Sequence, residues 1–297
     1  MRPRSMRVRL PVIRDTWFSN VGDEADGNCG GAEQLKVKSI QEMSLVDFDP
    51  SVLRGRVVRA AWLHVRLSGP ERLHRVSISS FAAPWVEGTG SGYEREIGSS
   101  TFNAQQHPGT PWSFPGSDLC DVTLGRSGTF WRSADASEPN ADRWQAVPVD
   151  PRVIAARIAG ISYGCLAFDD TGSEWSHAGE KFMLRVFPNR FFYSREAEWG
   201  RAPYFTVELG SEDREPPAAP DGLAAVVGDL PAGEAWLSWR AAADRGPAGV
   251  LGYFVEIDGR EAPRYLIPGS SDNLTAAEAT LPGAVGERVV RMHVRDL

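Results

Sequence analysis

The sequence predicts an all-β protein organised as sandwiches of packed sheets. Short runs rich in Val, Ile, Phe, Tyr and Trp recur between turn signals, and 30 glycines and 21 prolines are available to make those turns. Only one segment has the 3.6-residue periodicity of a helix. With 297 residues, of which 42% are hydrophobic, the chain is long enough for two folded domains.

Most of the strand-like runs precede residue 211, and their alternating side chains predict two packed sheets. The alternation is clearest in residues 57–67, where Trp62 and His64 fall on one face and Leu63 falls on the other. The predicted strands lie at residues 34–39, 43–49, 57–67, 74–82, 144–150, 164–170, 181–188 and 204–210.

One helix is expected, at residues 150–160. Asp150 can cap its N-terminus, Pro151 suits the first helical position, and Gly160 ends it. A short helix of this kind should lie across one end of the sandwich. Residues 86–143 are instead rich in Gly, Ser, Thr, Pro and Asn, so we expect extended loops there.

A linker is predicted at residues 211–220, because SEDREPPAAP combines charges with three prolines and has no apolar periodicity. Residues 1–210 then form a larger domain and residues 221–297 a smaller one. The smaller segment has five strand-like units, with Trp239 and Tyr253 in the second and third. It resembles a fibronectin type III domain, an immunoglobulin-like sandwich in which these two side chains pack between the sheets.

The fibronectin-like segment is expected to be truncated. Its last run, RVVRMHVRDL, corresponds to the sixth strand of such a domain, and no seventh strand follows. We therefore expect the natural chain to continue past Leu297.

Composition and charge exclude two classes of partner. The net charge is −7 and the basic residues are scattered, which argues against nucleic-acid binding. No run approaches the roughly 20 apolar residues that a membrane span requires, and the start of the chain has no visible signal peptide.

The three cysteines can form at most one internal disulfide. Cys29 and Cys120 each lie in or after a Gly-rich loop, so those two could meet at the surface. Cys165 lies in the apolar run ISYGCLAF and is expected to be a buried small hydrophobe.

An ordered set of phrases before residue 210 resembles one known family. They are RDTWFSN, NCGG, LVDFDPSVLRGRVVRAAWLHVRL, APWVEGTGSG, FNAQQHPGTPWSFPGSDL, WQAVPVDPRVIAARIAG, SYGCLAFDD and YSREAEWGRAPYFTVEL. Together, over about residues 12–209, they resemble the DNRLRE-type domains, which are related to carbohydrate-binding module family 96. Cys29 stands where an aromatic residue is common in that family.

This resemblance implies a jelly-roll β-sandwich in a secreted or cell-surface protein of bacteria or archaea. Such domains often stand beside polysaccharide-degrading modules, and some bind acidic polysaccharides such as alginate. The SREA phrase at residues 194–197 recurs in the family ahead of the final strand. Arg195 has a planar fork of donors and Glu196 is adjacent, so we expect the pair to clamp that loop rather than contact a ligand.

No catalytic residues are predicted. The acid–base pairs that hydrolysis requires need two carboxyls across a cleft. Asp169 and Asp170 would point to opposite faces of a strand. The remaining close pairs are expected to be solvated loop carboxylates: Asp47 with Asp49, and Glu94 with Glu96. No GxSxG motif occurs either.

Calcium is the cofactor that the sequence makes most credible. Asp23, Asp26 and Asn28, together with Glu24, form the densest cluster of oxygen-bearing side chains in a loop. Such oxygens suit a hard cation, although the spacing is not that of an EF-hand. The alternative is a solvated acidic loop.

Sugar recognition would use flat aromatic faces beside polar and basic side chains. Trp131 with Arg132 is the leading pair, because little apolar sequence surrounds it. The other candidate ligand contacts in loop-like segments are Trp85, Tyr93, Trp112 and Trp175. Each could instead serve in packing.

These observations favour a non-catalytic carbohydrate-binding or surface module of a larger exported protein, with a polysaccharide ligand that is expected to be acidic. Two alternatives stay open. The chain could be a structural or adhesive surface domain that binds no sugar, or an accessory part of a polysaccharide-degrading enzyme.

Overall fold

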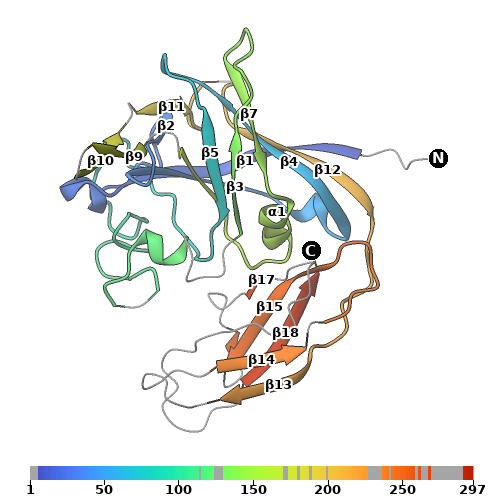
Figure 1. The fold of residues 1–297 in the computed structure, drawn as a ribbon. Coiled ribbons are helices and arrows are strands. Elements are labelled where there is room, and N and C mark those ends of the chain that lie inside the picture. Colours follow the sequence, from blue (N-terminus) through green and yellow to red (C-terminus); the bar gives the residue numbers. More distant parts are fainter. Residues whose placement is uncertain are drawn as a thin grey trace.

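The computed structural model describes residues 6–113, 115–123, 130–169, 173–178, 181–186, 189–198, 200–226, 236–240, 242–257, 260–261, 267–268 and 290–296. Within these residues nearly all regular structure is antiparallel strand, and Figure 1 shows the strands of the larger part wrapped around a common interior. The prediction of an all-β protein is confirmed. Each of the eight predicted strands before residue 211 is present, within a few residues of its expected bounds.

Eight strands form one hydrogen-bonded series, in the order β6-β5-β8-β3-β1-β12-β4-β7. The series folds over on itself, so that Ser137, just after edge strand β6, donates its N–H to the Ala146 carbonyl of the other edge strand, β7, at 2.9 Å. The strands are β6 (Trp131–Asp135), β5 (Arg75–Ser80), β8 (Cys165–Asp169), β3 (Glu42–Phe48), β1 (Met6–Ser19), β12 (Tyr204–Glu212), β4 (Arg56–Arg66) and β7 (Trp144–Val149).

Strand β1 belongs to both halves of this sandwich. Its first part pairs with β12, from Met6 opposite Leu209 to Pro11 opposite Tyr204. Its second part pairs with β3, and the register shifts just after Val12. The strand was not among those predicted. A proline lacks an N–H and usually argues against a central strand, but Pro11 lies at the point where β1 changes its partner from β12 to β3.

The core lies between the two halves. On β4 the alternation predicted from the sequence is present, and Ala61, Leu63 and Val65 are the side chains that turn inward. They pack with side chains of the opposite half such as Ile78 and Ala167. Trp62 and His64, between the inward residues, therefore lie on the outer side of the sheet.

The predicted helix is α1 (Pro151–Ile158). Asp150 caps it as expected, accepting a hydrogen bond from the Arg152 N–H at 2.9 Å. The helix covers one end of the sandwich, near the C-terminal strands (Figure 1). Its residue Ile154 shares a hydrophobic cluster with Leu251 of the C-terminal part.

Short elements complete the larger part. The described residues of 86–143 are mostly loop, as predicted, and loop side chains such as Phe102 and Trp112 share a second hydrophobic cluster with side chains of the sheet such as Phe18. The short elements are η1 (Gly22–Asp26), η2 (Ser51–Leu53), η3 (Leu119–Val122), β2 (Gln34–Val37) paired with β11 (Arg190–Tyr193), and β9 (Ser173–Ala178) paired with β10 (Lys181–Val186).

The C-terminal part has its own pairs of strands. Trp239 and Tyr253 are buried with ring centroids 5.3 Å apart, which confirms their expected packing. The predicted linker begins later than expected, because β12 continues to Glu212. The strands are β13 (Asp221–Val226), β14 (Trp236–Arg240), β15 (Val250–Ile257), β16 (Arg260–Glu261), β17 (Ile267–Pro268) and β18 (Val290–Asp296).

All three cysteines are free. The expected surface meeting of Cys29 with Cys120 is wrong, since Cys29 is buried in the core, where burial raises the pKa of its thiol to about 11. Cys165 is fully buried, as predicted. Across the described ranges, no helix combines the length and apolar character of a membrane span.

Candidate functional site

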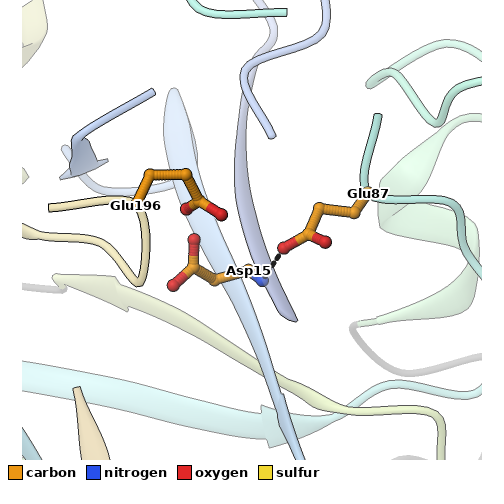
Figure 2. A group of neighbouring side chains, drawn as sticks. All are labelled: Asp15, Glu87 and Glu196. Carbon is orange, nitrogen blue, oxygen red and sulfur yellow. Dashed lines mark hydrogen bonds between the residues drawn. The ribbon is translucent and has the colours of Figure 1, made fainter. Parts of the chain in front are cut away.

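Three carboxylates from distant parts of the sequence meet beside β1 (Figure 2). Asp15 lies in β1, Glu87 in the loop after β5, and Glu196 in the turn after β11. One oxygen of each lies within 4.8 Å of the others. Asp15 is fully buried, whereas Glu87 and Glu196 are half-buried. We call these three residues the carboxylate cluster.

Arg195 ties the carboxylate cluster together. Its Nη2 lies 3.1 Å from both Glu87 carboxylate oxygens and 2.6 Å from Glu196 Oε1. Its backbone N–H donates to Asp15 Oδ2 at 2.8 Å, and the Asp15 N–H donates to Glu87 Oε1 at 2.6 Å. Arg195 therefore clamps the turn ahead of β12 to two other segments, as the sequence predicted.

Negative charge predominates in the carboxylate cluster, because it has three carboxyl groups and one guanidinium, which contacts Glu87 and Glu196. The pKa of Asp15 is raised well above its ordinary value, mainly by burial and secondly by the nearby Glu196 carboxylate. Burial also raises the pKa of Glu87, although hydrogen bonds from Asp15 and Arg195 oppose that shift. Keeping all three groups ionised therefore costs free energy unless more positive charge lies close by.

The loop that carries Glu87 is held by the glycine-rich NCGG segment. The fully buried Asn28 donates from Nδ2 to the carbonyls of Glu87, at 2.7 Å, and Ser100, at 3.1 Å. A Cβ on Gly30 would lie 2.0 Å from the Glu87 carbonyl oxygen. Only glycine allows the two backbones to approach this closely, which explains why position 30 of the NCGG segment is a glycine.

A second feature is the outer side of the sheet formed by β1, β12, β4 and β7. Strand register places Arg9 opposite Thr206, and Thr206 opposite Trp62. It also places Tyr204 opposite His64. Directly paired residues point to the same side of a sheet. We call this surface the outer face; its aromatic and basic residues are Arg7, Arg9, Trp62, His64, Arg66, Trp144 and Tyr204.

The rings and guanidinium groups of the outer face stack on one another. The Tyr204 ring lies parallel to the His64 ring, with centroids 4.5 Å apart, and the Arg9 guanidinium carbon lies 3.7 Å from the Tyr204 centroid. Trp144 contacts Tyr204 at 5.3 Å, and Arg7 lies 5.3 Å from the centroid of Trp62. The result is a half-exposed aromatic strip with basic side chains along it.

Positive charge on the outer face is only partly neutralised within the described residues. Arg7 pairs with Glu208. Arg66 donates to the Asp142 carbonyl, a neutral partner, and no ion pair to Arg9 is present in the described part of the chain. The pKa of His64 is lowered, mainly by burial and secondly by the positive charges of Arg9 and Arg7. His64 therefore favours its neutral form.

The predicted sugar-binding side chains that the structure describes are not brought together on one surface. Trp131 and Arg132 are exposed, but they lie in edge strand β6 rather than in a loop. Adjacent residues of a strand point to opposite sides, so the two cannot serve as a pair on one surface. The backbone of Trp175 lies in β9, and its side chain is outside the described residues.

The other predicted aromatic contacts serve in packing. Trp112 is buried and donates from Nε1 to the carbonyls of Thr101 and Phe102, both at 3.0 Å. Trp85 is buried as well, and its Nε1 donates to the Tyr163 carbonyl at 2.8 Å. Tyr93 is half-buried and packs edge-on against Trp17, with centroids 5.2 Å apart. Trp112 also packs edge-on against Phe18 of β1, so these aromatic side chains attach the surrounding loops to the sandwich.

The predicted calcium ligands do not converge either. Asp23 is exposed and lies 3.4 Å from Arg95 Nη2. Asp26 Oδ1 accepts from Asn103 Nδ2 at 3.0 Å. The Asn28 amide is occupied by loop backbone, since its Oδ1 also accepts the N–H groups of Gly30 and Gly90, both at 3.1 Å.

The close acid pairs are structural. Asp47 is buried, not solvated as expected, because Arg14 and Arg157 both bind it, with shortest N···O distances of 2.8 and 2.7 Å. Asp49 accepts hydrogen bonds from Ser51, as a loop carboxylate commonly does. Glu94 and Glu96 bind backbone N–H groups of residues 89–92.

No protein-family model matches the chain, and no curated protein matches it. Interpretation of its function therefore depends on the carboxylate cluster and the outer face. The sequence carries a local signal for the outer face alone: Trp62 and His64 alternate with core residues on β4, and Tyr204 does the same on β12.

Proposed function

We propose that this protein is a non-catalytic carbohydrate-binding module of a larger exported protein, and that the outer face binds an acidic polysaccharide. The observation that supports this most is the stack of Arg9, Tyr204 and His64, with Trp144 and Trp62 beside it. The resemblance to DNRLRE-type domains favours the same class of function.

The chemistry of the outer face suits a charged sugar chain. Flat rings stack on the CH faces of pyranose units, and guanidinium groups bind carboxylates in a bidentate manner. Arg9 and Arg66 have no acidic partner within the described ranges, so their charge is available to a uronate. The strip lies on rigid strands rather than on loops, which keeps its groups in fixed positions.

The carboxylate cluster, in contrast, does not suit catalysis on a polymer. Asp15 has no exposed surface, so a substrate could not reach it. Glu87 is already occupied by the Asp15 N–H and by Arg195. These contacts hold loops together, which supports a non-catalytic role.

Electrophoresis in gels that contain a polyuronate or a neutral glucan tests the proposal, because a bound polysaccharide retards the protein. Calorimetry then measures the affinity for each polysaccharide. Wild type should bind the polyuronate more tightly, and Tyr204→Ala should weaken binding about tenfold, because the central ring of the stack is lost. Circular dichroism and thermal melting would confirm that the variant is folded.

Trp131→Ala is the matched control, since it removes an exposed ring from β6, on the other half of the sandwich. It should leave binding unchanged. Loss of binding in this variant alone would overturn the assignment to the outer face. No binding to any polysaccharide would instead support a structural or adhesive surface domain, and hydrolysis of the polyuronate would indicate an accessory part of an enzyme.

A further inference from the structure

Two oxygen atoms of the carboxylate cluster have no hydrogen-bond partner among the described residues. They are Asp15 Oδ1 and Glu196 Oε2, and both are buried. Figure 2 shows the carboxyl groups of Asp15 and Glu196 turned toward each other. A buried acceptor without a partner is costly, and a buried carboxylate is costlier still.

The known contacts do not balance the charge at this point. Arg195 contributes one positive charge, and its side chain contacts Glu87 and Glu196 Oε1. Asp15 Oδ2 accepts the backbone N–H of Arg195, and the Asp15 carboxyl also lies against the carboxyl of Glu196, a neighbour of the same charge. With all three carboxyl groups ionised, one guanidinium leaves a formal charge of about −2 on the cluster, which is the charge that one divalent cation balances.

The positions of the oxygens also fit one ion. A calcium ion binds oxygens at about 2.3–2.6 Å, so ligands on opposite sides of it are about 4.6–5.2 Å apart. The nearest oxygens of Asp15, Glu87 and Glu196 lie within 4.8 Å of one another. One ion placed between them could therefore contact one oxygen of each carboxylate.

We propose that Asp15, Glu87 and Glu196 bind one calcium ion. Carboxylates are hard oxygen ligands, and no sulfur or imidazole from the described residues belongs to the group, which favours calcium over zinc. The ion would join β1, the loop after β5 and the turn ahead of β12. This site differs from the acidic loop at Asp23, whose side chain is exposed.

Calorimetry on the full chain tests this site after dialysis against a chelator. Wild type should bind Ca²⁺ with a stoichiometry of one, and adding Ca²⁺ should raise its melting temperature. Glu196→Gln, which keeps the shape of the side chain, should reduce Ca²⁺ affinity at least tenfold. Glu87→Gln should do the same and serves as the second test if Glu196→Gln does not fold.

Asp23→Asn is the matched control, because it removes one carboxylate from the acidic loop and leaves the carboxylate cluster intact. It should bind Ca²⁺ as wild type does. The proposal is wrong if dialysed wild type binds no Ca²⁺, in which case a shared proton between Asp15 and Glu196 replaces the ion. It is also wrong if Asp23→Asn abolishes binding while Glu196→Gln preserves it, or if Mg²⁺ binds in preference to Ca²⁺.

Discussion

The two halves of β1 present opposite environments. In the first half, Arg7 and Arg9 are exposed on the outer face and lie against aromatic rings. In the second half, Asp15 is fully buried, and the neighbouring Arg14 binds the buried Asp47. One continuous strand thus carries solvated charge at one end and enclosed charge at the other.

This difference shows how the same residue types take on different roles. An exposed arginine over a ring keeps water on one side and stays available to a ligand. A charge inside the sandwich must be matched by a partner, and then it fixes the relative positions of the segments that meet there. We therefore expect changes in the second half to affect folding, and changes in the first half to affect binding.

The largest effect is expected at Asp47, which pairs with the second half of β1. Asp47→Ala would leave Arg14 and Arg157 without their carboxylate, and should lower the free energy of unfolding by about 3 kcal/mol. Urea denaturation would measure this loss. Asp49→Ala, two positions along on an exposed turn, should leave the unfolding midpoint almost unchanged. Equal losses in both variants would contradict the comparison.

An intermediate effect is expected at Arg9 in the first half. Arg9→Gln should reduce affinity for a polyuronate about fivefold at low salt, with the unfolding midpoint unchanged. The reduction should shrink near 1 M salt, where charges more than about 3 Å apart are screened. Arg75→Gln, an equal charge change at the exposed start of β5, is the control. If both variants bind equally weakly, net charge rather than the outer face governs binding.

The smallest effect is expected from the titration of His64, which faces Thr206, Tyr204 and Arg9. Burial and the nearby arginines lower its pKa below the ordinary value of 6.5. As the pH falls, His64 therefore binds a proton in the unfolded chain before it does so in the folded chain. Wild type should lose stability as the pH falls below about 6.5. Urea denaturation at pH 7.5 and 5.5 should show that His64→Gln loses less. A loss as large as that of wild type would contradict this assignment.

Elements with local signals were predictable from the sequence. The Asp150 cap and Pro151 located α1, and the alternation of Leu63 with Trp62 located β4. Trp239 and Tyr253 were correctly paired in the C-terminal part. In each case the signal lies within one short stretch of the chain.

The carboxylate cluster had no such signal. Asp15 and Glu87 are 72 positions apart, and Arg195 is 108 positions from Glu87. Only the order of the strands brings them together. The predicted exposure of Trp85 and Trp112 was wrong for a related reason, because both side chains are buried in a cluster formed with residues far along the chain, such as Phe18 and Leu166.

The register of β1 against β12 has a mechanical consequence. Met6 lies opposite Leu209, so the start of the first strand and the exit toward the C-terminal part are at the same end of the pair. A pulling force applied at those two points would separate the strands like a zipper, breaking bonds one after another rather than all together. Tension along the chain would thus distort the surface around Arg9 and Tyr204 before it reached the segments joined at Asp15.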